Sequence, residues 1–532
     1  MGDGPKPHAP GSRRSGFDGE AAVVLAASVI FALPIWIGNH PPMVDYPQHL
    51  SMASMLRWYH DPLRNLSDVY TLALTRPNTV FFFLAAALSY LVPLAVAGKF
   101  LMWLSVVATG MAGLALARRA GRPGWYGLFS LLSAYNYAFF FGFANNVIAT
   151  PLLLYGIVLA DRRLDRPLRP GAWLVLAVYS ALFYVVHIQF LFLYVAAVGW
   201  LALVRYRGRR NLVGTASALS VGVALALSYH LIHGDKSTFG YHERNIYSDI
   251  HAPPLLYDKL MAIPEHLFGG RADDQHWLLF GLAMLAVLVA CSASSRPAAE
   301  EDRETDARPP LRARVFGTLS RTRFHTLAAW FLFSYFLMPH VFVGVFVYQR
   351  LVAVAFLMLP AVLPIPNPGR TRTVKLVLGA ALAALSIATA DAAHTFHLES
   401  RGGHELIAKT SPGKNLMAIM IWMGSTGIQN PPMFLNFGAH YVAEKGGRIF
   451  FSFAELRIAP VQLPPELEFE DQYAGMNEWQ PRRFRFADFG YHYDYFLCRG
   501  NFDWLKRIFG KHLSRLAWEV RDDWILLWRK PL

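Results

Sequence analysis

About a dozen apolar stretches, interrupted at intervals by short arginine-rich runs, limit what this chain can fold into. A helix needs about 20 apolar residues to cross the hydrocarbon core of a membrane. Ionised groups are costly there, in keeping with a chain of 532 residues that is 54% hydrophobic and only 16% charged. The sequence therefore predicts an α-helical polytopic membrane protein. Its candidate spans are Ala21–Ile37, Val80–Ala97, Phe100–Ala117, Trp125–Phe141, Val147–Ala160, Ala172–Val186, Gln189–Val204, Leu212–Ile232, Trp277–Cys291, Leu327–Leu337, Leu351–Ile365 and Leu376–Ala390.

The basic clusters predict the membrane topology of the spans. Short loops rich in Lys and Arg stay in the cytoplasm, so we interpret the net charge of +14 as a membrane pattern rather than a nucleic-acid footprint. From Arg118 onward two apolar stretches separate neighbouring clusters, but three lie between Arg14 and Arg118. We therefore predict that Val80–Ala97, which contains Pro93, is re-entrant or lies along the membrane, which leaves about eleven true spans. The clusters are Arg13/Arg14, Arg118/Arg119/Arg122, Arg162/Arg163/Arg166/Arg169, Arg205/Arg207/Arg209/Arg210, Arg312/Arg314/Arg321/Arg323 and Arg370/Arg372/Lys375.

An odd number of spans and a cytoplasmic N-terminus place the end of the chain outside the cytoplasm. We predict a disordered cytoplasmic N-terminus at residues 1–20, a transmembrane domain at 21–392 and a small extracytoplasmic α/β domain at 393–532. Strand-like runs in the last domain are Arg448–Phe453, Tyr495–Leu497 and Trp524–Trp528. The first apolar stretch has no small-residue cleavage site and is interpreted as a retained span. The two cysteines, Cys291 and Cys498, have no disulfide or metal-site spacing.

The first outward loop holds the most distinctive carboxylate of the sequence. Pro41, Pro42 and Pro47 stiffen the backbone around Asp45, which precedes an amphipathic helix at the membrane surface. A carboxylate there can take a proton from a sugar hydroxyl as general base. Its spacing of four residues from His49 also lets the two share a helix face or a divalent metal. The alternative is that Asp45 only caps the helix that begins near Pro47.

The run Asp45-Tyr46-Pro47-Gln48-His49-Leu50 resembles the signature of GT-C fold glycosyltransferases. It is closest to a group of bacterial membrane proteins with an Asp-Tyr-Pro-Asn-His-Leu type motif after the first span, and Gln48 is the departure from it. The likeness extends to the whole layout, with an interfacial helix, about eleven spans and an outer C-terminal domain. The second outward acidic residue of metal-binding members has no match at Asn136–Asn146. No cofactor is therefore predicted, and a divalent metal is left open.

The resemblance implies a membrane glycosyltransferase of the cell envelope, in a bacterial inner (plasma) membrane. Its donor would be a polyprenyl-phosphate sugar, and its acceptor a glycan, a lipid or a protein. Carried over, Asp45 is the general base that deprotonates the acceptor hydroxyl at the outer face of the membrane.

Other outward polar residues are candidates for binding substrate. Arg350, at the start of a span, can bind the phosphate leaving group, with snorkelling to the headgroups as its alternative. His187 and Gln189 lie at a bend between spans and can bind sugar or phosphate, or form only a polar turn. The aromatic run from Tyr137 to Phe143 suits sugar binding or simple packing. The remaining candidates are Tyr46 and His49 in the first loop, Asn145 and Asn146 beside the aromatic run, and His242 and Arg244 in a long loop that could close over the donor.

Two other functions stay open. One is a lipid or glycan transporter or flippase, which would need ionisable groups at the middle of the membrane. The other is a non-catalytic scaffold for glycan assembly. Grouping of Asp45, His187 and Arg350 around one cavity favours the enzyme, and scattered positions favour the scaffold.

Overall fold

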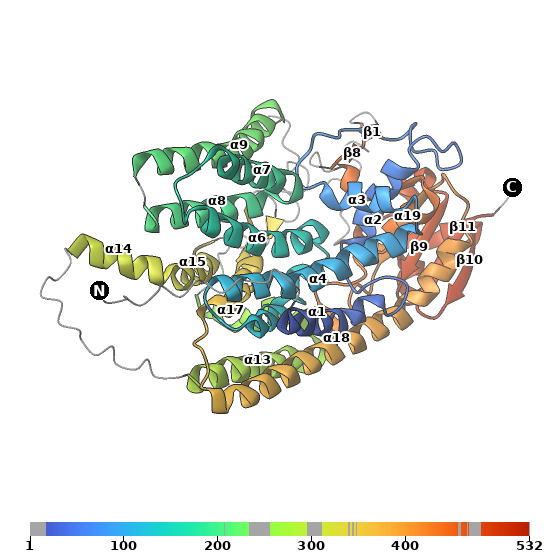
Figure 1. Ribbon diagram of the computed structural model, residues 1–532. Helices are drawn as coiled ribbons and strands as arrows, with labels where there is room; N and C mark the ends of the chain where they lie inside the picture. The colour runs from blue at the N-terminus through green and yellow to red at the C-terminus, as the bar shows by residue number, and fades with distance from the viewer. Residues whose placement is uncertain are drawn as a thin grey trace, which may run out of the picture.

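The computed structural model describes residues 18–206, 208–233, 256–294, 311–338, 341–342, 345–346, 348–455, 459–464, 467 and 480–530. Most of them form a long helical bundle, and a β-sheet lies at one end of it near the C-terminus (Figure 1). Of the predicted disordered N-terminus, residues 1–17 lie outside the described residues, and Gly19 and Glu20 form the first turn of α1.

Six of the described helices are long and apolar enough to cross a membrane. They are α1 (Gly19–Phe31) with the 3-10 turn η1 (Leu33–Trp36), α4 (Leu94–Arg119), α6 (Ala144–Arg163), α9 (Arg209–His233), α13 (Gln275–Ser292) and α18 (Thr371–Ala408). Five shorter segments lie between them, namely η2 (Gly124–Ser133) with α5 (Tyr137–Phe141), α7 (Pro170–Val186), α8 (Ile188–Val204), α15 (Arg323–Leu337), and α16 (Leu351–Leu357) with α17 (Leu359–Val362).

Helix α4 runs from one end of the bundle to the other. At the start of α4 the carbonyl of Ala95 faces the hydroxyl of Tyr46, 3.4 Å away, and Arg119 closes the same helix. At 1.5 Å per residue these positions are about 36 Å apart, slightly more than the thickness of a hydrocarbon core. The described part of the chain thus contains six helices long enough to cross and five shorter segments between them, and the number of about eleven spans stays a prediction.

The stretch Val80–Ala97 is broken, as its Pro93 suggested. α3 (Val80–Leu88) has only 9 residues, and α4 begins after Pro93. A helix of that length covers about 14 Å, which is too short to cross. α3 packs instead on α2 (Tyr46–Arg57), the predicted helix of the first loop.

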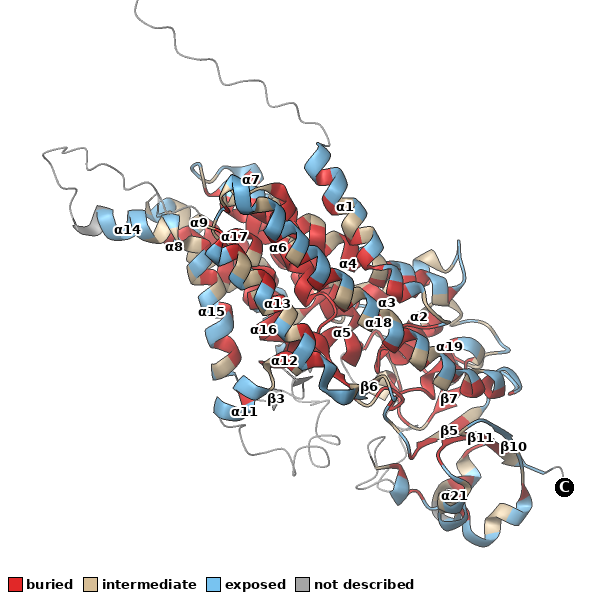
Figure 2. Cartoon of the chain, turned by 90° about the horizontal axis from the view of Figure 1, so that it is seen from below, coloured by how far each residue is buried: buried red, intermediate tan, exposed pale blue. Residues whose placement is uncertain are grey.

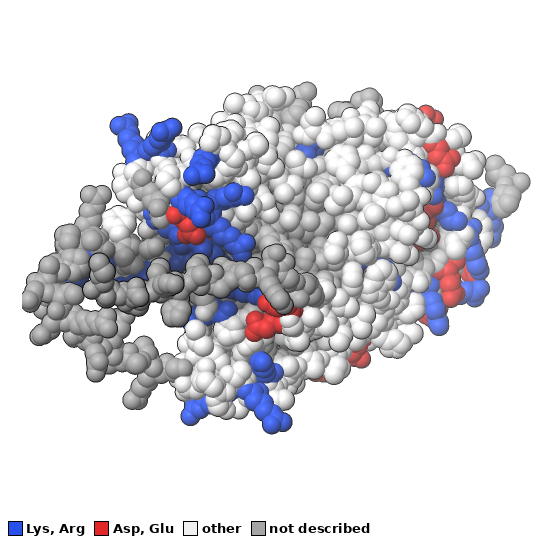
Figure 3. All heavy atoms as spheres, viewed as in Figure 1, with Lys and Arg blue, Asp and Glu red and all other residues white. Residues whose placement is uncertain are grey.

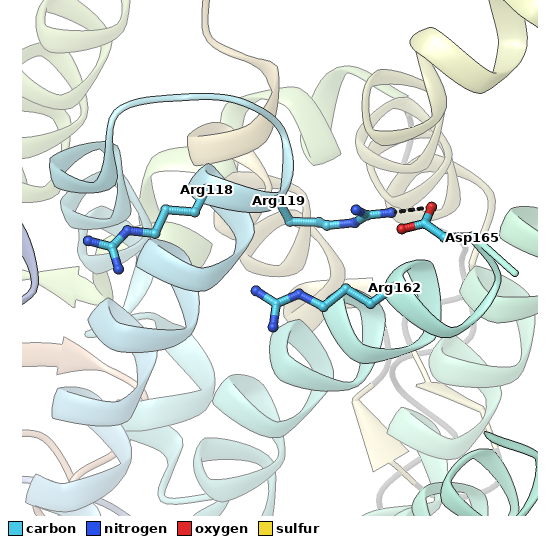
Figure 4. Close-up of a pocket in the computed structure, with 4 residues that line it drawn as sticks. All are labelled: Arg118, Arg119, Arg162 and Asp165. Carbon is cyan, nitrogen blue, oxygen red and sulfur yellow. Dashed lines mark hydrogen bonds and ion pairs between the residues drawn. The ribbon is translucent and has the colours of Figure 1, made fainter. Parts of the chain in front are cut away.

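The predicted basic clusters meet at one end of the bundle. Asp161 of α6, fully buried, accepts hydrogen bonds from Arg119 at the end of α4, Arg205 at the end of α8 and Arg323 at the start of α15. We call this the arginine-rich end; Figure 3 shows Lys and Arg gathered there, an almost uncharged surface along the middle of the molecule, and mixed charges at the other end. A cavity of about 590 Å³ opens here between Arg118, Arg119, Arg162 and Asp165 (Figure 4).

Loss of the Asp161 charge is expected to destabilise the bundle. In Asp161→Asn three guanidinium groups that are only 13–18% exposed lose their common counter-charge. Breaking a buried ion pair from one side costs about 3–5 kcal/mol, so the thermal midpoint of the detergent-solubilised protein should fall. The control is Asp503→Asn, whose carboxylate is 77% exposed beside Lys506 and should contribute under about 1 kcal/mol. Equal midpoints for both variants would contradict the expectation.

The C-terminal part contains a five-stranded mixed sheet in the order β10-β11-β9-β5-β7. Two of the three predicted strand-like runs form strands, and of Arg448–Phe453 only the first two residues do. Side chains alternate along the strands, as the pleat requires. Leu497 and Leu526 face the core shared with the bundle, and Phe496 and Leu527 face a separate core under α21. The elements are β5 (Asn415–Met420), α19 (Ala439–Lys445), β7 (Arg448–Ile449), β9 (Tyr495–Arg499), α21 (Phe502–Phe509), β10 (Leu516–Arg521) and β11 (Trp524–Arg529).

The sheet is joined to the bundle without a break. α18 runs through the predicted domain boundary at residue 392, and Trp524 of β11 donates to the Glu399 carbonyl on this helix at 2.7 Å. α19 packs against α2, so the C-terminal part covers the first loop (Figure 2). Short strand pairs add further links, with β1 (Thr71–Leu72) on β8 (Val461–Gln462) and β2 (Gly270–Arg271) on β6 (Ile428–Asn430).

Candidate active site at the end opposite the arginines

Asp45 is held by its own backbone against the bend after α5. The amides of Val44 and Asp45 donate to the carbonyls of Phe140 and Phe141 at 3.0 and 2.9 Å. Gly142 follows with φ +90°, and a Cβ built there would lie 2.5 Å from the Asp45 nitrogen. Only glycine tolerates both this conformation and this approach. The aromatic run thus forms the support on which the first loop rests.

The Asp45 side chain does not act as a helix cap. Asp45 occupies the position before α2, but its carboxylate makes no capping hydrogen bond to that helix. Instead its Oδ1 accepts a hydrogen bond of 2.7 Å from Nδ2 of Asn436, which comes from the C-terminal part of the chain. The carboxylate is only 6% exposed. The geometry therefore disfavours the capping alternative.

Gln48 links the same two parts of the protein. Its Nε2 donates to the carbonyl of Phe451 at 3.0 Å, and its Oε1 accepts from the amide of Phe453 at 3.1 Å. Both amide groups are thereby satisfied in a buried position. Gln48, which stands where the resembling motif has Asn, thus has a structural role, because its hydrogen bonds attach α2 to the segment after β7.

Three of the predicted binding residues, Arg350, His187 and Gln189, come together. Nη1 of Arg350 lies 3.1 Å from Nε2 of His187 and 3.4 Å from Oε1 of Gln189. The guanidinium also lies over the ring of Phe143, 3.7 Å from its centroid, and is 5% exposed. Its Nε is buried and makes no hydrogen bond among the described residues.

Asp45 and Arg350 belong to one electrostatically connected group. The Asp45 carboxylate stabilises the charge of the Arg350 guanidinium, and Tyr137 lies within reach of both. His187 interacts with Arg350 and with His49. Three residues from the first loop, the bend between α7 and α8, and the start of α16 therefore gather at the end opposite the arginine-rich end.

The other sequence candidates have mostly packing contacts. His49 stacks on Phe82 at 5.3 Å between ring centroids, and Tyr46 is completely buried. Asn145 uses both ends of its amide, accepting from the Phe81 amide at 2.8 Å and donating to the Asn78 carbonyl at 2.5 Å, so it fixes the start of α3. The Nδ2 of Asn146 is buried beside a small cavity under α4, without a hydrogen bond among the described residues.

Two predicted site residues lie outside the described residues, and two described residues near the site were not predicted. His242 and Arg244, predicted to contact the donor, lie outside the described residues. Asn436 was not predicted, because nothing in its local sequence signals a contact 391 positions away. Glu265 of α12 (Ile263–Phe268) is a second acidic side chain near Tyr137, and its oxygen Oε1 accepts from Asn430.

Asn436 is expected to act as a positioning residue for Asp45. Its hydrogen bond favours the ionised carboxylate, so Asn436→Ala should make the base harder to ionise. We expect kcat of any reaction that uses this base to fall about tenfold, with the acidic limb of its pH profile moved to higher pH. The control Asn501→Ala removes the cap of α21, where Oδ1 accepts from the Trp504 amide at 3.2 Å. It should lower stability by about 1 kcal/mol and leave the pH profile unchanged.

Comparison with known proteins gives the fold. No family model matches the sequence, and no curated protein matches it. Among solved structures, ArnT from Cupriavidus metallidurans bound to undecaprenyl phosphate is similar with a TM-score of 0.51 at 10% identity, over 95% of this chain and 97% of ArnT. The apo structure of the same protein is similar with a TM-score of 0.50 at 11% identity, over 96% and 97%. ArnT is a GT-C fold glycosyltransferase, and the chain is therefore a polytopic membrane protein with the GT-C fold, as the sequence predicted.

Proposed function

We propose that this protein is a membrane glycosyltransferase that moves a sugar from a polyprenyl-phosphate donor to an acceptor at the outer face of the membrane. The observation that carries the proposal is that a buried carboxylate, Asp45, and a buried guanidinium, Arg350, interact electrostatically at one end of a membrane-spanning bundle. The two groups supply what the reaction needs, a base for the acceptor and a cation for the leaving group.

The chemical step is a single displacement at the sugar. Asp45 takes the proton from the acceptor hydroxyl, and the acceptor oxygen forms a bond to the anomeric carbon. The bond from that carbon to the phosphate oxygen breaks, and the electron pair leaves with the polyprenyl phosphate. Arg350 stabilises the added negative charge, because a guanidinium can donate two parallel hydrogen bonds to phosphate oxygens.

The surroundings of Arg350 support a role in binding an anion. A buried charge is costly unless it is compensated; the hydrogen-bond partners of Arg350, His187 and Gln189, are neutral, and the compensating charge is that of Asp45. The partnerless Nε gives a phosphate oxygen a donor to bind. The similar ArnT structure holds undecaprenyl phosphate, a molecule of the class that leaves in the proposed step.

The proposed orientation follows from the charges. With the arginine-rich end in the cytoplasm, Asp45 and the C-terminal sheet lie on the outer side. In a bacterial inner membrane a polyprenyl-phosphate donor would then keep its chain in the lipid and its phosphate at the membrane surface, near Arg350.

Incorporation of label tests the function directly. Membranes that contain the protein, and matched membranes without it, are supplied with polyprenyl phosphates carrying different radiolabelled sugars. We expect label to move into an acceptor fraction only where the protein is present, and added polyprenyl phosphate to inhibit the transfer. A scaffold would give no incorporation by the purified protein, and a flippase would move the intact donor across vesicles without breaking its glycosyl bond.

A further inference from the structure

A second group of polar side chains lies outside the proposed active site and has no part in its chemistry. Three imidazoles, those of His40, His404 and His440, lie together with ring centroids 4.1 to 4.8 Å apart. The carboxylate of Glu444 joins them, 3.5 Å from Nδ1 of His404. One ligand atom from each of the four residues lies within 4.8 Å of the others.

The four residues come from three separate parts of the chain. His40 precedes Asp45 in the first loop, and His404 lies near the end of α18. His440 and Glu444 are one turn apart on α19, so their side chains share a helix face. The fold thus brings three imidazoles and one carboxylate together from distant parts of the sequence. Apolar packing alone does not require such a cluster.

The polar atoms of the group are poorly satisfied by the protein itself. His440 is 1% exposed and His40 is 8% exposed. Both ring nitrogens of His440, together with Nδ1 of His40 and Nε2 of His404, are buried without a hydrogen bond among the described residues. Buried polar groups are normally paired, so an arrangement with four unpaired nitrogens calls for a partner that the protein does not supply.

We propose that His40, His404, His440 and Glu444 form a binding site for one divalent transition metal ion, with zinc as its preferred occupant. Three nitrogens and one carboxylate oxygen are a complete tetrahedral set for zinc, with bonds of about 2.0–2.2 Å. The protein supplies all four ligands, so the ion has a structural role and leaves no open position for chemistry.

The geometry needs only a small contraction around the ion. Ligand atoms of a tetrahedral zinc site lie about 3.3 Å apart, and here they lie within 4.8 Å of one another. Rotation of the imidazoles about their side-chain bonds can close this difference. Glu444 is 38% exposed and marks the path by which an ion enters.

The ion would tie the first loop to the C-terminal part next to Asp45. His440 follows Asn436 by four residues, and the Ala439 amide donates to the Asn436 carbonyl at 3.0 Å. Fixing α19 on His40 and His404 therefore also fixes the residue that donates to Asp45. This is a positioning effect on the proposed active site, and metal binding itself does not depend on sugar transfer.

Metal content of the whole protein tests the site. The full chain is purified in detergent, its affinity tag is removed, and metals are measured by elemental analysis after incubation with zinc and gel filtration. We expect one zinc ion per chain in the wild type and in the control His60→Ala, whose exposed ring lies in the same outer loop. His404→Ala and His440→Ala should lose the ion. Chelation of the wild type should lower its thermal midpoint by about 5 °C or more.

Two further measurements keep the test decisive if His404→Ala or His440→Ala misfolds. Glu444→Gln changes only a half-exposed carboxylate and should fold normally while weakening zinc affinity about tenfold or more. Cobalt in place of zinc should give the visible absorption of a tetrahedral site in the wild type. A wild type that holds well under one zinc per chain, or folded His404→Ala and His440→Ala variants that keep a full equivalent, would overturn the proposal.

Discussion

Asp45→Asn is expected to lower kcat for sugar transfer by about 10²- to 10⁴-fold, the range that general bases contribute. The substitution keeps the shape of the side chain, and its Oδ1 can still accept the hydrogen bond from Asn436. What it removes is the negative charge and the ability to take a proton. Initial rates at saturating donor and acceptor measure kcat directly, and the KM of the donor should change little.

Asp61→Asn is the matched control for this variant. Asp61 lies in the same outer loop and pairs with Arg64 at 3.5 Å, with the two side chains 32% and 17% exposed. Such a pair contributes under about 1 kcal/mol, and transfer should stay within about twofold of the wild type. Both variants are checked for equal thermal midpoints and elution volumes. Wild-type transfer by a folded Asp45→Asn protein would remove Asp45 from the mechanism.

Arg350→Gln is expected to lower kcat/KM for the donor by about 10²- to 10³-fold, the loss found when one donor to a developing charge is removed. It should also weaken inhibition by polyprenyl phosphate, which reports phosphate binding without turnover. Arg350→Lys keeps the charge but loses the planar pair of donors, so only part of the activity should return. The His187 and Gln189 contacts at 3.1 and 3.4 Å are set for a guanidinium.

Arg271→Lys is the control for the general effect of replacing a buried arginine. Arg271 is 2% exposed, and it donates to the carbonyls of Phe268 and Ala388 at 3.1 and 2.7 Å and to the Thr389 hydroxyl at 3.0 Å. Its substitution should reduce stability, with inhibition by polyprenyl phosphate unchanged per folded molecule. If polyprenyl phosphate instead inhibits Arg350→Gln as strongly as the wild type, Arg350 does not bind phosphate and has only a structural role.

The sequence by itself determined that this protein is a helical membrane protein with many apolar segments. Apolar length and arginine placement are local properties, because the membrane acts on each segment separately. The broken stretch at Pro93 and the strands around Tyr495 and Trp524 could be predicted for the same reason. Asp45 also stood out locally, since prolines on both sides mark a stiff loop at the end of a span.

Only the tertiary structure decided which side chains meet. Asn436 reaches Asp45 across 391 positions, and His40 meets His440 across a similar separation. No periodicity or charge pattern encodes such a contact, because it depends on how α19 packs on α2 after the spans have assembled. The choice between a cap and a base at Asp45 rested on this packing, which turns the carboxylate toward Asn436 and within reach of the Arg350 charge.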